Sequence, residues 1–135
     1  MRPMTTILIV GSISLLPLKI QAQEIQLNCQ VERSVELKSG KEIAPESFSA
    51  IVRMTQDGTA TIDATTGFCF NYVGSFSEQE VDGSCERTVS IAGKNEKFTA
   101  RLTINRFNGA FDHSLMTGLS IYSSSGRCTP GKKLF

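Results

Sequence analysis

The only histidine of the chain lies in the segment Asp112-His113-Ser114, which contains the three residue types of a serine-hydrolase triad. In such a triad an aspartate orients a histidine, and the histidine activates a serine hydroxyl. Consecutive residues of a strand point to opposite faces of a sheet, so Asp112 could not orient His113 within one regular strand. The chain also contains no G-x-S-x-G segment, which exposes the nucleophile of many hydrolases. We therefore expect no catalytic residue here and interpret His113 as a strand residue.

A second candidate is the acidic segment Glu78-Gln79-Glu80-Val81-Asp82-Gly83, which is similar to the start of a calcium-binding loop. Carboxylate oxygens suit Ca²⁺, but an EF-hand loop needs a bidentate glutamate at its twelfth position. Val89 occupies that position, in a segment with the pattern of a strand. We therefore expect a solvated hairpin loop here, and no metal or cofactor in the protein. The 13 acidic residues would allow a pair of catalytic carboxylates, but the sequence singles out no two of them.

Basic residues concentrate in the last third of the chain, although 14 Lys+Arg and 13 Asp+Glu nearly balance overall. Residues 93–135 carry seven basic and two acidic side chains. The overall balance argues against a nucleic-acid partner, which would require a strong basic excess. A local positive surface could instead bind an anionic envelope component weakly, and the alternative is an ordinary charged outer face of a sheet. The candidate patch consists of Lys97, Arg101, Arg106 and Arg127.

Residues 1–22 have the layout of a secretory signal peptide. Arg2 precedes the apolar run Ile7–Leu18, and Ala22 precedes the expected cleavage site. As a helix this run would rise only about 18 Å, short of the roughly 30 Å hydrocarbon core of a bilayer. We therefore expect a periplasmic or secreted protein, with residues 23–135 forming one β domain and no transmembrane helix after cleavage.

Alternation of apolar and polar residues dominates the rest of the chain and predicts strands with one face in the core. One further run, Phe68–Val73, is apolar on both faces and predicts a central strand. The segment Lys41–Ser49 could hold one short helical turn, limited by Pro45. The sequence thus predicts an all-β, antiparallel sandwich or small barrel of about seven or eight strands. The alternating runs are Ile25–Val31, Ala60–Ala64 and Phe98–Ile104, and the glycines between runs, including Gly83, Gly118 and Gly126, predict turns.

All four cysteines follow the expected signal peptide, which indicates two disulfides in a small exported domain. A metal site is the alternative, but the chain has no C-x₂-C pair and only one histidine. Spacing alone leaves three pairings open. Because terminal strands are often neighbours in a closed or sandwiched sheet, the expected architecture favours a Cys29–Cys128 disulfide. Cys69 and Cys85 would then bridge the two arms around the Gly74–Gly83 loop.

Three parts of the chain match one recurring pattern: Thr103–Gly109, Gly126-Arg127-Cys128 near the C-terminus, and the early Cys29. The pattern consists of an I-[DN]-R-x-[TN]-G strand and turn, a final G-x-C strand and an early cysteine. It resembles that of small uncharacterised exported β-proteins of Gram-negative bacteria. The resemblance implies an exported, periplasmic β fold and no activity, and the Cys69/Cys85 pair is an addition to the pattern.

These observations favour a non-enzymatic exported protein that binds an unknown component or protein of the bacterial envelope. One alternative is an inhibitor of an envelope-attacking enzyme, because small disulfide-stapled barrels that block lysozymes are similar in size and compartment. A second alternative is a small carboxylate-dependent hydrolase, and a third is a structural or assembly component of the envelope. The enzyme and binding-protein hypotheses predict different surfaces. An enzyme should have polar residues that converge in a deep pocket, whereas a binding protein should present a flat or patch-like surface.

Overall fold

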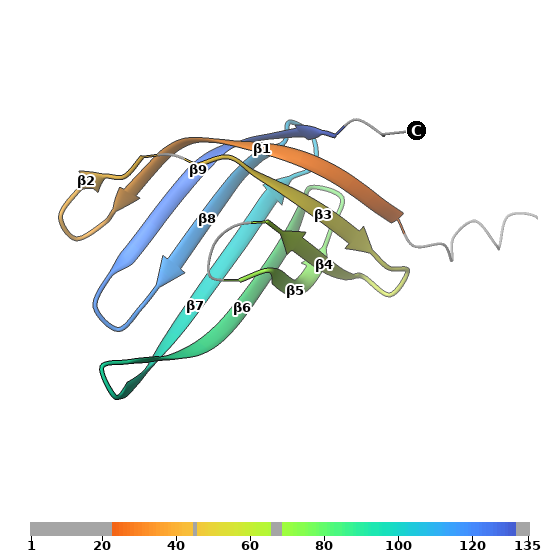
Figure 1. Cartoon of the computed structure of the whole chain (residues 1–135). Coiled ribbons are helices and arrows are strands. Elements are labelled where there is room, and N and C mark those ends of the chain that lie inside the picture. Colours follow the sequence, from red (N-terminus) through yellow and green to blue (C-terminus); the bar gives the residue numbers. More distant parts are fainter. Residues whose placement is uncertain (1–22, 45, 66–68, 132–135) are drawn as a thin grey trace, which may run out of the picture.

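Antiparallel strands make up most of the chain that the computed structural model describes, which comprises residues 23–44, 46–65 and 69–131. Each long strand pairs with the next in the sequence, and the last strand returns to pair with the first (Figure 1). The eight long strands therefore close into a barrel, and the short β2 pairs antiparallel with the end of β1. The strands are β1 (Gln23–Glu36), β2 (Lys41–Glu42), β3 (Phe48–Met54), β4 (Thr59–Ala64), β5 (Asn71–Phe76), β6 (Glu80–Ile91), β7 (Lys94–Asn105), β8 (Ala110–Met116) and β9 (Ile121–Pro130).

The barrel confirms the predicted all-β antiparallel class and identifies a barrel rather than a sandwich. The alternating runs predicted as strands lie within β1, β4 and β7. In β4, for example, Ala60, Ile62 and Ala64 are buried while the residues between them are half-exposed. The expected signal peptide, residues 1–22, lies outside the described residues. Within the described part of the chain, no helix is long and apolar enough to cross a membrane.

The run Phe68–Val73 does not form the central strand that was predicted. Phe68 lies outside the described residues, β5 begins only at Asn71, and Phe70 is exposed. A barrel wall has one buried face, so Tyr72 points into the core while Val73 points outward. The segment Lys41–Ser49 contains no helical turn among its described residues, since β2 begins at Lys41 and Phe48 starts β3.

Two glycines predicted to lie in turns, Gly83 and Gly126, lie instead inside strands β6 and β9. Both are buried. At Gly126 an added Cβ would collide with the backbone carbonyl oxygen of Gln30 on β1. The close approach of these two strand backbones therefore requires a glycine at this position. In a single sequence such a glycine cannot be distinguished from a glycine in a turn.

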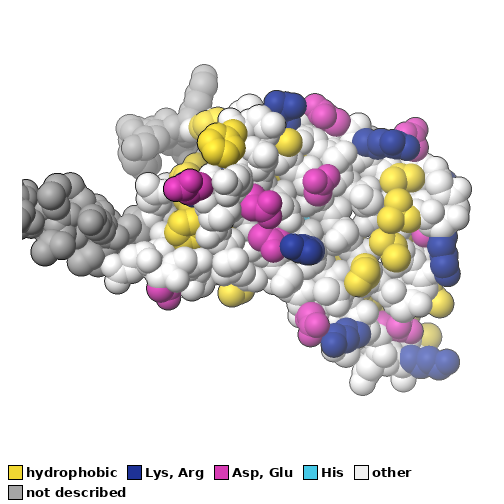
Figure 2. Space-filling model, turned by 180° about the vertical axis from the view of Figure 1, so that it is seen from behind, with side chains coloured by type: hydrophobic (Ala, Val, Ile, Leu, Met, Phe, Trp, Pro, Cys, Tyr) yellow, Lys and Arg dark blue, Asp and Glu magenta, His cyan; other side chains and the backbone are white. Residues whose placement is uncertain are grey.

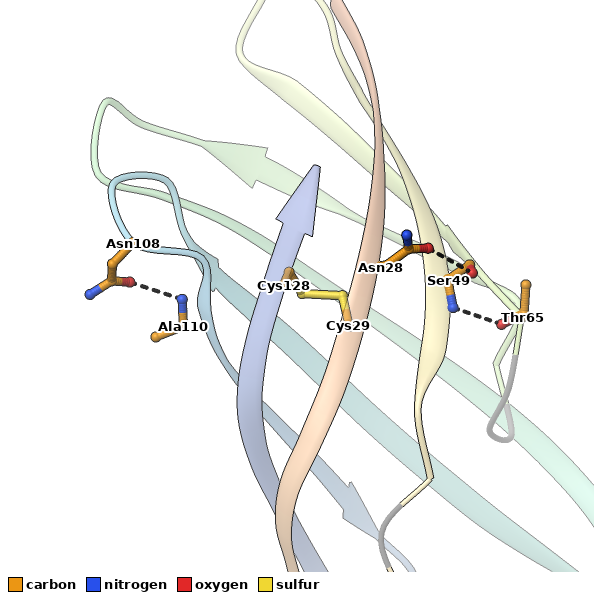
Figure 3. The surroundings of a disulfide bond; sticks show 7 residues. All are labelled: Asn28, Cys29, Ser49, Thr65, Asn108, Ala110 and Cys128. Atoms are coloured by element: carbon orange, nitrogen blue, oxygen red, sulfur yellow. Dashed lines mark hydrogen bonds between the residues drawn. A yellow bond between two sulfur atoms is a disulfide. The ribbon is translucent and has the colours of Figure 1, made fainter. Parts of the chain in front are cut away.

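Two disulfides fasten the barrel, and the described residues contain no free cysteine. Cys29 and Cys128 are paired in register across the seam of β1 and β9, with Cα atoms 3.9 Å apart (Figure 3). Cys69, just before β5, is joined to Cys85 of β6. These are the pairs that the expected architecture favoured. Disulfides are compatible with an oxidising, exported compartment.

The two ends of the barrel differ. At one end, which we call the termini end, β1 begins and β9 ends, beside the β3–β4, β5–β6 and β7–β8 turns. At the other, the mouth end, lie the β1–β2, β6–β7 and β8–β9 turns (Figure 1). The buried core lies between them, around Ile62, Leu102 and Phe111.

Candidate functional site

A cavity of about 190 Å³ opens inside the barrel between the core and the mouth end. Its walls are inward-facing side chains of seven strands, and Ile43, Ala44 and Glu46, between β2 and β3, cover one side. Phe48 and Phe111 pack edge to face in the wall, with ring centroids 5.3 Å apart. The lining residues are Val31, Ser34, Ile43, Ala44, Glu46, Phe48, Ala64, Tyr72, Leu102, Phe111, His113 and Ser124.

A hydrogen-bonded pair of side chains, Tyr72 and His113, lies in this wall. The Tyr72 hydroxyl is 2.9 Å from His113 Nε2, and the two rings meet edge to face. His113 faces inward because it alternates with Asp112 on β8, and Asp112 is exposed on the outer face. Asp112 therefore does not orient the imidazole. Tyr72 reaches His113 from β5, on another part of the barrel wall.

Burial favours the uncharged form of both members of this pair. Burial lowers the pKa of His113 below its ordinary value of 6.5 and raises the pKa of Tyr72 to about 12. A neutral imidazole has one donor and one acceptor nitrogen. Since Nε2 bonds to Tyr72, and no described residue bonds to Nδ1, that second nitrogen can recognise a further polar group.

A second polar pair and one carboxylate complete the cavity wall. Ser34 of β1 and Ser124 of β9 share a hydrogen bond of 2.8 Å between their hydroxyl oxygens. The hydroxyl that donates this bond can still accept others, and the hydroxyl that accepts it can still donate its own hydrogen to a further group. Glu46 is the only carboxylate among the lining residues, and it is exposed. The site is therefore an apolar cavity with a few neutral hydrogen-bonding groups.

We expect His113 to make the stability of the barrel depend on pH. Because its folded-state pKa is lowered, the unfolded chain takes up a proton first as the pH falls. The free energy of unfolding should thus be highest above about pH 6.5 and decrease below it, before most carboxylates titrate. Urea unfolding of the wild type should show this decrease, and a His113→Gln variant should lack it. An equal decrease in both proteins would contradict the assignment, since the chain has no other histidine.

The four cations of the predicted anionic-partner patch occupy two separate places. Lys97 and Arg101 lie on the outer face of β7 and are paired with carboxylates of β6. Lys97 Nζ is 3.4 Å from Glu86, and Arg101 donates two hydrogen bonds to Asp82, at 2.9 and 2.8 Å. These bonds from Arg101 hold the pKa of Asp82 below its usual range.

The other two cations, Arg106 and Arg127, lie at the termini end and donate to backbone carbonyl oxygens. Arg106 bonds to Ser77 at 2.6 Å, and Arg127 to Asn108 at 3.3 Å. The four side chains thus do not form one continuous surface, and their binding to an anionic partner stays a prediction.

The acidic segment Glu78–Gly83 forms the β5–β6 turn and the beginning of β6. Ser77 Oγ accepts hydrogen bonds from the backbone N–H groups of Gln79 and Glu80, which shapes the turn. No group of three His, Cys, Asp or Glu side chains that could hold a metal ion occurs among the residues described.

Sequence analysis singled out His113 but assigned it no role in a site, and it missed the partner Tyr72, because barrel closure brings these distant residues together. No signal in the sequence links the two residues, because Tyr72 lies in the run Phe68–Val73, whose apolar residues fall on both faces. No protein-family model matches the chain, and no curated protein or solved structure is similar to it at a significant level.

Proposed function

We propose that this protein is an exported, non-enzymatic binding protein of the bacterial envelope that holds a small uncharged molecule inside the barrel. The observation that carries the proposal is the cavity beside Tyr72 and His113, which combines apolar walls with a few neutral polar groups. Such a combination is typical of ligand sites, in which apolar walls supply affinity and polar groups supply orientation.

The size of the cavity restricts the ligand. A protein cavity of about 150 Å³ accepts benzene, and this cavity is slightly larger, at about 190 Å³. A single ring with one or two small substituents would fill it. A longer lipid or an oligosaccharide would have to extend out of the mouth end.

The electrostatics of the cavity favour a neutral ligand. No charged side chain is buried among the described residues, and burial favours the neutral form of His113. A charged ligand would lose its hydration without gaining a buried counter-charge, which is costly. His113 Nδ1 and the hydroxyls of Ser34 and Ser124 can instead bond to a hydroxyl or carbonyl group. The ligand class is therefore a neutral ring with one hydrogen-bonding substituent.

The same lining supports binding rather than hydrolysis. Hydrolysis of a glycosidic bond generally requires two carboxyl groups facing each other across the substrate. Glu46 alone reaches this cavity, and it is exposed. The two disulfides support the proposed export, and the periplasm and the extracellular space are both oxidising compartments.

Calorimetry with phenol as the probe tests the proposal. We expect phenol to bind with a dissociation constant of about 1 mM or below, equivalent to about −4 kcal/mol, and more tightly than benzoate. An Ala64→Leu substitution would place a larger side chain in the cavity and should weaken phenol binding at least about tenfold, or 1.4 kcal/mol. Ala110→Leu, on the outer face of β8, is the matched control and should leave binding unchanged. Equal binding by the wild type and the Ala64→Leu variant would overturn the proposal.

A further inference from the structure

The β6–β7 hairpin projects beyond its neighbouring strands at the mouth end of the barrel (Figure 1). On one side the pairing of β6 with β5 ends at Ser84, and on the other the pairing of β7 with β8 begins only at Thr99. β6 and β7 nevertheless stay paired with each other as far as Ile91 and Lys94, without a register shift. Residues 86–98 therefore form a two-stranded ribbon, and no described strand pairs with either of its edges.

The backbone groups on the β6 side of this ribbon have no partner. Successive residues of a strand direct their N–H and C=O groups to opposite sides. The carbonyl oxygen of Gln79 accepts from Arg106, just after β7, and that of Glu80 accepts from Ser77, just after β5. Even-numbered residues of β6 thus face away from β7, and beyond the last pair with β5 no described backbone group bonds to them. We call these residues the open edge, and they are Glu86, Thr88 and Ser90.

The open edge lacks the common features that keep strand edges from pairing, which are lysines, prolines and bulges. β6 contains none of these, and its charged residues beyond the last pair with β5, Glu86 and Arg87, have opposite signs. The other edge of the ribbon, on β7, instead carries Lys94 and Lys97. Figure 2 shows positive and negative side chains side by side at the lower right, where the ribbon projects. A second chain would therefore not meet charge of a single sign at the open edge.

The ribbon also offers apolar surface beside the open edge. Val89 is half-exposed and Ile91 is 50% exposed, and both alternate with the edge residues. They lie on the face of β6 that continues into the barrel interior, since Val81 of the same face is buried. A strand added at the open edge would gain backbone hydrogen bonds and would also cover part of this apolar surface. The partner that fits the edge is therefore an extended strand.

The β6 strand of a second copy can satisfy all three edge residues at once. In an antiparallel pairing centred on Thr88, that residue lies opposite the partner's Thr88, and Glu86 lies opposite the partner's Ser90. Each such pair would exchange two backbone hydrogen bonds. On the apolar face, Arg87 lies opposite the partner's Val89, which its aliphatic stem can cover. No like charges lie directly opposite each other, which would be unfavourable, and Thr–Thr pairs are favourable.

We propose that the protein forms a two-fold symmetric dimer in which the open edges of two copies pair antiparallel. The two ribbons would then join into one four-stranded sheet, with the barrels at its two ends. The self-complementary register identifies a second copy as the partner, and two-fold dimers are the commonest closed assemblies. The proposal is independent of the ligand in the cavity, because no residue of the open edge lines the cavity wall.

Sedimentation equilibrium over a range of protein concentrations tests the dimer. A Thr88→Pro substitution removes an N–H that has no partner within one copy, so the barrel should keep its stability in urea. The dimer should lose that hydrogen bond, and its dissociation constant should rise at least about tenfold. The matched control is Lys97→Pro, because Lys97 is paired directly with Thr88 but its N–H faces the other edge of the ribbon. The control should dimerise like the wild type.

A cross-link tests the register itself. Residues directly opposite in a hydrogen-bonded antiparallel pair have Cα atoms about 5.5 Å apart, which suits a disulfide. Mild oxidation should therefore link two copies of a Thr88→Cys variant, and a Lys97→Cys variant should stay unlinked. Phenol binding should be unchanged in all these variants, which separates this proposal from the one for the cavity.

Three results would overturn the dimer. The first is a protein that stays monomeric at every concentration, and the second is a dimer that Thr88→Pro leaves intact or that both cysteine variants cross-link equally. The third is a monomer that binds a synthetic peptide of alternating valine and threonine, which would assign the open edge to a strand of a different protein.

Discussion

Replacing Cys29 and Cys128 together by alanine is expected to lower the free energy of unfolding by about 4–5 kcal/mol, which would unfold much of the protein at 37 °C. The two cysteines are 99 residues apart in the sequence, so their disulfide closes nearly the whole described chain into one loop. A cross-link over such a loop removes much of the conformational entropy of the unfolded chain. The pair also joins β1 to β9, where the barrel closes.

Denaturant unfolding under non-reducing conditions measures this loss. The control is the Cys69→Ala/Cys85→Ala variant, whose disulfide spans 16 residues and should contribute about 3 kcal/mol. The seam disulfide should therefore be the more stabilising of the two. Equal losses, or a larger loss for the short loop, would contradict this ranking.

A single added methyl group at Gly126 is expected to cost about 3 kcal/mol or more, at the upper end of the usual cost of overpacking. The Cβ of Gly126→Ala would collide with the carbonyl oxygen of Gln30 and press on the ring of Phe111. The backbones of β1 and β9 would have to separate, which weakens the seam. Thermal and denaturant unfolding measure the cost.

Gly118→Ala is the matched control, because its new methyl group would meet only the flexible end of Glu96, at 3.2 Å. That substitution should change the free energy of unfolding by less than about 0.5 kcal/mol. A Gly126→Ala variant as stable as the wild type would contradict the close seam between β1 and β9.

The class of fold could be predicted from the sequence because alternation is a local property. In β7 the inward residues Phe98, Ala100 and Leu102 are apolar and their neighbours polar, so seven residues suffice to identify the strand. Closure into a barrel depends instead on pairing between β1 and β9, at opposite ends of the chain. Gly126 marks that pairing, but a glycine in a single sequence is equally compatible with a turn.

Less of the candidate site than of the fold could be predicted, because the site also depends on contacts between distant parts of the chain. The alternation of β8 separates Asp112 from His113, and this argument needed only local geometry. The hydrogen bond between His113 and Tyr72 depends on the closure of the barrel. The charge of residues 93–135 was visible in the sequence, but the carboxylates that pair with Lys97 and Arg101 come from the preceding strand. A charge count by segment does not include such partners.

The most direct measurement of the central claim is a nuclear Overhauser experiment on the purified protein saturated with phenol. If the ligand lies inside the barrel, its ring protons should show contacts with Leu102, Phe111 and the imidazole of His113. The same contacts should be absent in the Ala64→Leu variant. Contacts only with outward-facing side chains such as Phe107, or no contacts at saturation, would contradict a binding site inside the barrel.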